Sequence, residues 1–446
     1  MLPVSNPLLP QDNSNNAQKH DPYAAFRHTG YRHYTVGWVL VVLFTQVQSV
    51  ALQWEILQRT DSPMALGLVG LMQIIPALIL ILPAGHLADT YDRRRVMMVG
   101  MVGTTMTSLG LGVMSILVAP LWSIYAVLFL DAVFLTIARP ARSAMLPLLV
   151  PAENFANAVT WNSSLFHLAL IVGPALGGLV IAIYIPAAFF LSATASTLFG
   201  VLLLTLQLRK TQENKREPVS LHTMLGGFRF IWKTKLILGA ITLDMVAVFL
   251  GGVVYLLPIF AKDILEVDAK GFGLMRAAPA IGAVLMSVVL AHLPPMQRAG
   301  RALLWSVVGY GVATIGFGLS PWFGLSLLML FLTGVLDMVS VVVRHTLVQL
   351  ATPDEMRGRV SAVNGVFIDV SNELGGFRAG AVAEFIGPVV TVVSGGIGTI
   401  LVVGITALTI PALARLKQLQ DIKTSPTGTR TGRIERMPQH PEGLCK

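Results

Sequence analysis

The chain has 446 residues, of which 54% are hydrophobic and only 12% are charged. An ordinary soluble domain carries about twice that share of charged residues, and one core cannot bury so much apolar surface. The composition therefore excludes a soluble globular protein and indicates a membrane protein. The net charge of +9 does not call for a nucleic-acid partner, because the basic residues follow the membrane topology described below.

Apolar runs of about 20 residues match the length that a helix needs to cross a hydrocarbon layer about 30 Å thick. Twelve such runs predict an all-α integral membrane protein with twelve transmembrane helices. They cover residues 34–57, 64–87, 96–118, 121–142, 157–183, 187–208, 236–260, 272–293, 302–319, 323–343, 361–386 and 389–413.

The spans divide six and six around a polar, basic linker. We expect a cytoplasmic N-terminal tail at 1–33, a six-helix bundle at 34–208, a cytoplasmic linker at 209–235, a second bundle at 236–413 and a basic tail without fixed structure at 414–446. Within the linker, Leu221, Leu225, Phe228 and Trp232 recur at helical spacing. This pattern predicts an amphipathic helix lying on the inner leaflet.

Basic residues set the orientation. Of the 32 Lys and Arg residues, only Arg59, Lys262, Lys270 and Arg276 fall on the side opposite the termini, and Arg378 lies within a span. The positive-inside rule therefore predicts a multi-pass protein of the cell (plasma or inner) membrane with both termini cytoplasmic. Residues 1–33 contain no apolar signal core, so the first span is expected to be a retained anchor.

The two halves of the chain share an internal repeat. At an offset of 202 residues the second half repeats several residues of the first, among them Arg142 with Arg344, Pro151 with Pro353, Asn162 with Asn364, and Gly173 with Gly375. The pairs map the fourth and fifth spans onto the tenth and eleventh. They predict two pseudo-symmetric bundles related by an axis along the membrane normal.

A short polar segment joins the second and third spans, Gly85-His-Leu-Ala-Asp89-Thr-Tyr-Asp-Arg93-Arg-Arg. It resembles the loop between helices 2 and 3 of major facilitator superfamily transporters, although Thr90 and Asp92 depart from the usual Arg and Gly. The resemblance implies a cytoplasmic latch formed by Gly85, Asp89, Arg93 and Arg139. Topology anchoring is the alternative role for Arg94 and Arg95.

The fifth span contains Gly173-Pro174-Ala175-Leu176-Gly177-Gly178. This run resembles the end of the glycine-proline motif of drug:proton antiporters in the same superfamily. Small residues allow close helix contact and Pro174 bends the helix, so Gly173, Pro174, Gly177 and Gly178 are predicted to pack against a neighbouring helix.

Two further stretches narrow the resemblance. Arg139-Pro-Ala-Arg142 with Leu146–Pro151, and Arg357–Val360 with Ser371–Gly375, are similar to the enterobactin-exporter and macrolide-efflux branch of the superfamily. That branch commonly continues Glu-Phe-Glu-Ser-Gly, whereas this chain has Gly376-Phe377-Arg378-Ala379-Gly380. The role of Arg378, where the family has an acid, stays open.

Ionisable and amide side chains inside the spans are candidates for the proton and substrate path, because an ionisable group at the bilayer centre costs at least ~2.5 kcal/mol unless it is paired or hydrated. These candidates are Gln46, Asp131, His167, Asp244, Asp337, Asp369, Glu373 and Arg378. Asp131, Asp369 and Glu373 are expected to line the path and to exchange protons, with structural pairing to Arg142, Arg344 or Arg378 as the alternative. For His167 the alternative is a hydrogen-bonded packing residue.

The sequence contains no phosphate loop of the Gly-x-x-x-x-Gly-Lys-Ser/Thr type, no metal-ligand spacing and a single cysteine, Cys445. We therefore expect neither an enzyme nor a cofactor. The prediction is a monomeric, alternating-access secondary transporter that exports an amphipathic, drug- or siderophore-like small molecule in exchange for protons. A facilitator or importer of a metabolite or lipid-like substrate, and a membrane sensor that does not transport, remain the alternatives.

Overall fold

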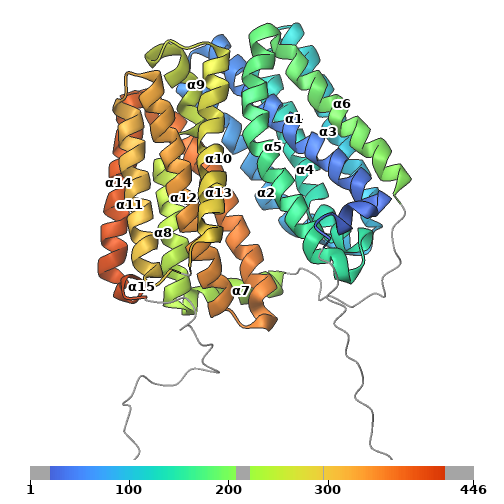
Figure 1. Ribbon diagram of the computed structural model, residues 1–446. Coiled ribbons are helices and arrows are strands. Elements are labelled where there is room, and N and C mark those ends of the chain that lie inside the picture. Colours follow the sequence, from blue (N-terminus) through green and yellow to red (C-terminus); the bar gives the residue numbers. More distant parts are fainter. Residues whose placement is uncertain (1–20, 207–220, 295, 417–446) are drawn as a thin grey trace, which may run out of the picture. The chain divides into compact units, whose positions relative to one another are not determined.

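The computed structural model describes residues 21–206, 221–294 and 296–416. Every regular element in this part of the chain is a helix (Figure 1). The predictions for residues 1–20, for 209–220 of the linker and for 417–446 of the C-terminal tail lie outside the described residues. The longer helices are α1 Thr29–Thr60, α2 Pro63–Thr90, α3 Arg93–Ile116, α4 Leu121–Leu149, α5 Phe155–Ile183, α6 Ile185–Thr205, α7 Leu221–Lys233, α8 Lys235–Gly251, α10 Ala269–His292, α11 Ala299–Leu319, α12 Phe323–Ala351, α13 Asp354–Ile386 and α14 Pro388–Thr409.

Among the described residues, 11 helical stretches are long and apolar enough to cross a membrane, against the twelve predicted. The difference is α13, which contains the predicted span 361–386 but is not among them. Its helix begins earlier than predicted, with Pro353 as N-cap and Asp354 and Glu355 in the first turn. Carboxylates are favourable at that end of a helix. The polar side chains along α13 make its hydropathy too low for a span defined by composition alone.

The chain forms two compact units. The first contains residues 1–61, 72–218 and 267–277, and the second contains 62–71, 219–266 and 278–446. Each unit therefore includes the first turns of one helix, α2 or α10, whose remainder belongs to the other. We describe each unit by itself.

In the first unit, α1 packs against α5 and α6, and α3 packs against α4 and α6. Its core contains large side chains that are fully buried, including Tyr31, Met97, Met101 and Phe199. The first turns of α10 pack on α5, where a Cβ added to Gly178 would lie 2.6 Å from the carbonyl oxygen of Ala269. Only a glycine allows this approach.

In the second unit, α11 packs against α12 and α14, and α8 packs against α13 and α14. The first turns of α2 belong here because Glu384 of α13 accepts hydrogen bonds from Ser62 Oγ at 2.8 Å and from the Met64 amide at 3.0 Å. A carboxylate at a helix N-terminus satisfies amide groups that have no partner within the helix.

The predicted internal repeat appears in the helix bounds. Helix α4 runs from Leu121 to Leu149 and α12 from Phe323 to Ala351, so both ends of α12 lie 202 residues after those of α4. The repeated arginines differ in their partners. Arg142 lies over the ring of Trp38 on α1, 4.2 Å from its centroid, whereas Arg344 pairs with the carboxylate of Asp244 on α8.

The seventh predicted span, 236–260, is a broken helix. Helix α8 ends at Gly251, and the chain continues through 3-10 turn Val254–Leu256, the short α9 Leu257–Ile259 and π-helical turn Phe260–Ile264. Such a break leaves carbonyl groups without intrahelical donors, and these groups need partners at membrane depth.

Candidate functional site

The polar segment that joins α2 to α3 is held by local capping. Asp92 is the N-cap of α3, and its Oδ1 accepts the Arg95 amide at 3.0 Å. Arg93 donates to the Ala144 carbonyl of α4 at 3.5 Å, and Arg94 donates to the Leu204 carbonyl at the end of α6. Gly85 is buried, while Asp89 and Arg139 are exposed. The basic run thus joins three helices of the first unit, and the latch stays a prediction.

The glycine run of α5 faces α1 and α10. A Cβ on Gly173 would lie 2.5 Å from Gln46 Cβ, and one on Gly177 would lie 2.9 Å from Val50 Cβ. Pro174 is buried between these glycines. Gln46 is consequently placed at the α1–α5 contact.

Two further candidates lie in the first unit. Asp131 on α4 is 5% exposed, and its Oδ1 accepts a hydrogen bond from Thr107 Oγ1 of α3 at 2.5 Å. This bond satisfies Asp131 within the α3–α4 contact. His167 is exposed and packs edge-on against Phe166, with ring centroids 5.7 Å apart.

In the second unit, Asp244 of α8 and Arg344 of α12 form an ion pair. Asp244 is 6% exposed and Arg344 is 3% exposed, so both charges are removed from solvent. The pair is electrically neutral, and a buried pair is costly to break because the remaining charge loses its compensation.

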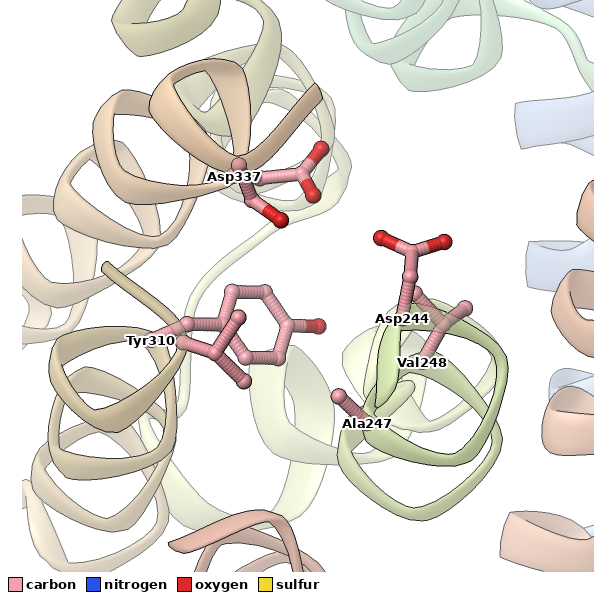
Figure 2. Close-up of a pocket in the computed structure, with 7 residues that line it drawn as sticks. Asp244, Ala247, Val248, Tyr310 and Asp337 are labelled. Carbon is pink, nitrogen blue, oxygen red and sulfur yellow. The ribbon is translucent and has the colours of Figure 1, made fainter. Parts of the chain in front are cut away.

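A small cavity adjoins this ion pair. It has a volume of about 10 Å³ and is lined by Asp244, Ala247, Val248, Val307, Tyr310, Asp337 and Ser340. That volume is close to the space of one water molecule. In Figure 2 the carboxyl groups of Asp337 and Asp244 and the ring of Tyr310 approach the same space from three helices.

The remaining candidates lie on α13. Glu373 accepts a hydrogen bond from the hydroxyl of Tyr255, and Asp369 is partly buried four residues earlier. Arg378 donates from Nε to the Phe249 carbonyl at 2.9 Å and from its terminal nitrogen to the Leu250 carbonyl at 2.5 Å. Arg378 therefore supplies donors to the broken end of α8, a role that no spacing in the sequence indicated.

Two other side chains complete this end of α8. The Tyr310 hydroxyl donates to the Gly251 carbonyl at 3.3 Å, and Thr399 Oγ1 donates to the Ala247 carbonyl at 3.2 Å. Tyr310, Ser340 and Arg344 were not predicted as site residues. One signal was available, because Asp337, Ser340 and Arg344 follow the i, i+3, i+7 spacing of one helix face.

The family model described as transmembrane secretion effector matches residues 20–428 of this chain. The enterobactin exporter EntS of Escherichia coli O1:K1 is 26% identical over 393 residues, which cover 88% of this chain and 94% of the relative. The relative of the same name from Shigella boydii serotype 18 gives the same identity and coverage.

Solved structures show the same fold. A point mutant of the nucleoside transporter NupG has a TM-score of 0.70 at 12% identity, covering 85% of this chain and 100% of that one. A bacterial homologue of the human lysosomal transporter Spinster has a TM-score of 0.67 at 15% identity, covering 91% of this chain and 100% of that one. Together with the membrane-spanning helices, these matches show that the chain belongs to the transmembrane secretion effector family, has the major facilitator fold and is a multi-pass membrane transporter, not an enzyme.

Proposed function

We propose that this protein is an alternating-access exporter of an amphipathic, siderophore-like small molecule, driven by proton entry. Export is supported by the match to proteins named enterobactin exporter. This match extends over 94% of the relative's length and is not confined to one motif. Proton coupling is supported by the acidic side chains within the helices of both units, since a membrane-embedded carboxyl group is expensive unless it has a use.

The substrate class is proposed from the same relatives. Enterobactin is the first compound to test, and a macrolide is the second because the sequence motifs resemble that efflux branch. The departure at Arg378 argues against copying substrate preference directly. In this chain the position holds an arginine whose guanidinium group donates to carbonyl groups of α8. A ligand therefore meets no carboxylate at this position.

The orientation follows from the basic residues, and both termini are proposed to be cytoplasmic. Single cysteines at Thr211 and Ser425, in a background without Cys445, should react with an impermeant maleimide only from the cytoplasmic side. A cysteine at Lys270 should react only from the opposite side. Reaction at position 211 from the outside would reverse the orientation.

The transport test uses inside-out membrane vesicles, in which the cytoplasmic face is exposed to the medium. Enterobactin or a macrolide should accumulate in the lumen when the lumen is acidic, and a protonophore should abolish accumulation. Vesicles without the protein are the background control. Uptake that only equilibrates, whatever the gradient, would contradict coupling and indicate a facilitator, and no uptake of either compound would reject this substrate class.

A variant pair tests the acids first predicted from the sequence. Asp131→Asn removes the carboxylate that Thr107 holds, and Glu373→Gln removes the one that Tyr255 holds. If either group carries the coupling proton, its variant loses gradient-driven accumulation but retains downhill exchange. Accumulation at the wild-type level in both variants would place the coupling proton elsewhere.

A further inference from the structure

The cavity between α8, α11 and α12 contains a carboxylate whose charge nothing balances. Within the described residues, the carboxyl group of Asp337 accepts no hydrogen bond and pairs with no cation, although it lines the cavity. Three other acids within the helices each have a hydrogen-bond or ion-pair partner. Asp131 is bonded to Thr107, Glu373 to Tyr255 and Asp244 to Arg344.

A second observation points to an occupant of this cavity. Ser340 is 2% exposed and lines the cavity, yet its hydroxyl has no hydrogen-bond partner. The Nε group of Arg344, one turn further along the same helix face, is also without a partner. Buried polar atoms are rarely left unsatisfied, and a water molecule that joins several of them is the usual resolution.

The net charge of the cluster indicates how many protons it binds. Asp244 and Asp337 together with Arg344 carry one negative charge in excess when both carboxyl groups are ionised. One bound proton makes the cluster neutral. Because Arg344 pairs with Asp244, the proton belongs on Asp337.

The surroundings offer no other charge to replace that proton. Helix α8 contributes Asp244, α11 contributes the neutral Tyr310, and α12 contributes Arg344 with His345 beside it. Helix α10 contacts α12 through the Pro279 backbone and carries no charged side chain from Ala278 to Ala291, and α14 has no titratable residue. On α13, Asp369, Glu373 and Arg378 do not line the cavity.

The internal repeat allows the polar residues of α12 to be compared with the residues at the same positions of α4. At the repeat offset, Asp337 and Ser340 of α12 correspond to Leu135 and Ala138 of α4. The two helices have the same length and matching ends, so the fold at this position is built without polar side chains. The second unit therefore carries polar groups here that packing does not require.

We propose that Asp337 is the proton-binding group of the second unit, with one water molecule in the cavity joining it to Ser340 and to the Asp244–Arg344 pair. Release of the proton leaves a carboxylate that competes with Asp244 for Arg344, two turns away on the same face of α12. Proton binding thereby decides whether α8 and α12 are held together by their ion pair. The role of this proton in transport rests on the proposed proton-coupled export, but the test of the proton site needs no substrate.

The test is infrared spectroscopy of the purified full-length protein in lipid, recorded from acidic to alkaline pH in H₂O and D₂O. The wild type should show the C=O stretch of a protonated carboxyl group that shifts in D₂O and disappears as the pH rises. Asp337→Asn should lose this band, with a loss equal to one carboxyl group per chain. A spectrum unchanged by Asp337→Asn would overturn the proposal.

A matched pair of serine variants tests the cavity itself. Ser340 and Ser326 both lie on α12, both are buried and both have hydroxyl groups without partners, but only Ser340 lines the cavity. Ser340→Ala should shift the carboxyl band in frequency and in the pH at which it disappears, and Ser326→Ala should leave it in place. Equal effects of both variants would overturn the proposal, even if Asp337→Asn does not fold.

Two further arms separate the alternatives. Replacing choline chloride by sodium chloride at constant pH should leave the band unchanged, and its loss on adding sodium would assign the cavity to a metal cation instead. If the band behaves as expected but vesicles do not accumulate enterobactin or macrolide, the proposed function fails and the proton site stands. If gradient-driven transport occurs without the band, the proton site fails alone.

Discussion

Replacing Arg344 by glutamine should destabilise the protein in a strongly pH-dependent way. The substitution leaves the Asp244 carboxylate at 6% exposure without its cation. Removing one partner of a buried ion pair costs about 3–5 kcal/mol. The folded variant can remove this unpaired charge by binding a proton at Asp244.

The free energy of protonating Asp244 depends on the pH. Protonating a carboxyl group of ordinary pKa, about 3.9, costs roughly 4 kcal/mol at pH 7 and roughly 1.5 kcal/mol at pH 5. The loss of stability in Arg344→Gln relative to the wild type should therefore be at most about 4 kcal/mol at pH 7. It should shrink by about 1.4 kcal/mol for each pH unit down to pH 5.

The sign follows from proton linkage. The folded variant holds a proton at Asp244 that its unfolded chain releases above pH 5, so its stability falls as pH rises. In the wild type the ion pair holds no such proton. The slope thus belongs to the difference in stability between the two proteins.

The assay is denaturant unfolding in detergent micelles at pH 5, 6, 7 and 8. Arg142→Gln is the matched control, because Arg142 holds the equivalent repeat position but lies over Trp38 instead of a carboxylate. The double variant Asp244→Asn/Arg344→Gln should regain most of the lost stability and lose the slope. An Arg344→Gln deficit that is the same at pH 5 and pH 8, or a matching slope in Arg142→Gln, would refute the reasoning.

Three other outcomes are expected. Arg378→Met leaves two α8 carbonyls without donors and should lower the unfolding free energy by about 1–3 kcal/mol in the same assay, and an unchanged value would mean that water replaces the guanidinium group. Gly178→Val would place a side chain against Ala269 and should reduce the monodisperse yield in gel filtration. Gly404 has open space around it, so Gly404→Val should not reduce the yield. Equal yields of the two variants would contradict the close α5–α10 approach. Asp89→Asn should lengthen spin-label distances across the cytoplasmic side if Asp89 is part of the latch, and unchanged distance distributions would make it passive.

The helices were largely predictable because their signal is local. Apolar runs of spanning length identify a membrane helix without any tertiary information, and eleven stretches meet that condition in the described residues. The repeat between α4 and α12 was also visible, since two copies of one sequence pattern need no structure to be compared. Helix α13 contains the predicted span 361–386, but its charged side chains keep it out of the eleven stretches that length and hydropathy alone identify.

The site was less predictable because its contacts are distant in sequence. Arg344 was considered as a partner for Asp131, Asp369 or Glu373, whereas its partner is Asp244, 100 residues earlier on another helix. For Arg378, pairing with an acid was the alternative and its role was open, whereas it binds backbone carbonyls that become available only because α8 ends at Gly251. A prediction from periodicity treated residues 236–260 as one continuous helix and could not supply those acceptors.

The break after α8 also joins this helix to its neighbours. Carbonyl groups in its last turns accept hydrogen bonds from Arg378 of α13, Tyr310 of α11 and Thr399 of α14. A hinge needs backbone groups that exchange partners cheaply, but each carbonyl here would lose its donor in a medium without water. The break is therefore unsuited to act as a hinge, because side chains of α11, α13 and α14 all donate to the end of α8. The short 3-10, α and π turns that follow, residues 254–264, are packed as well, because Leu256, Leu257 and Phe260 are fully buried.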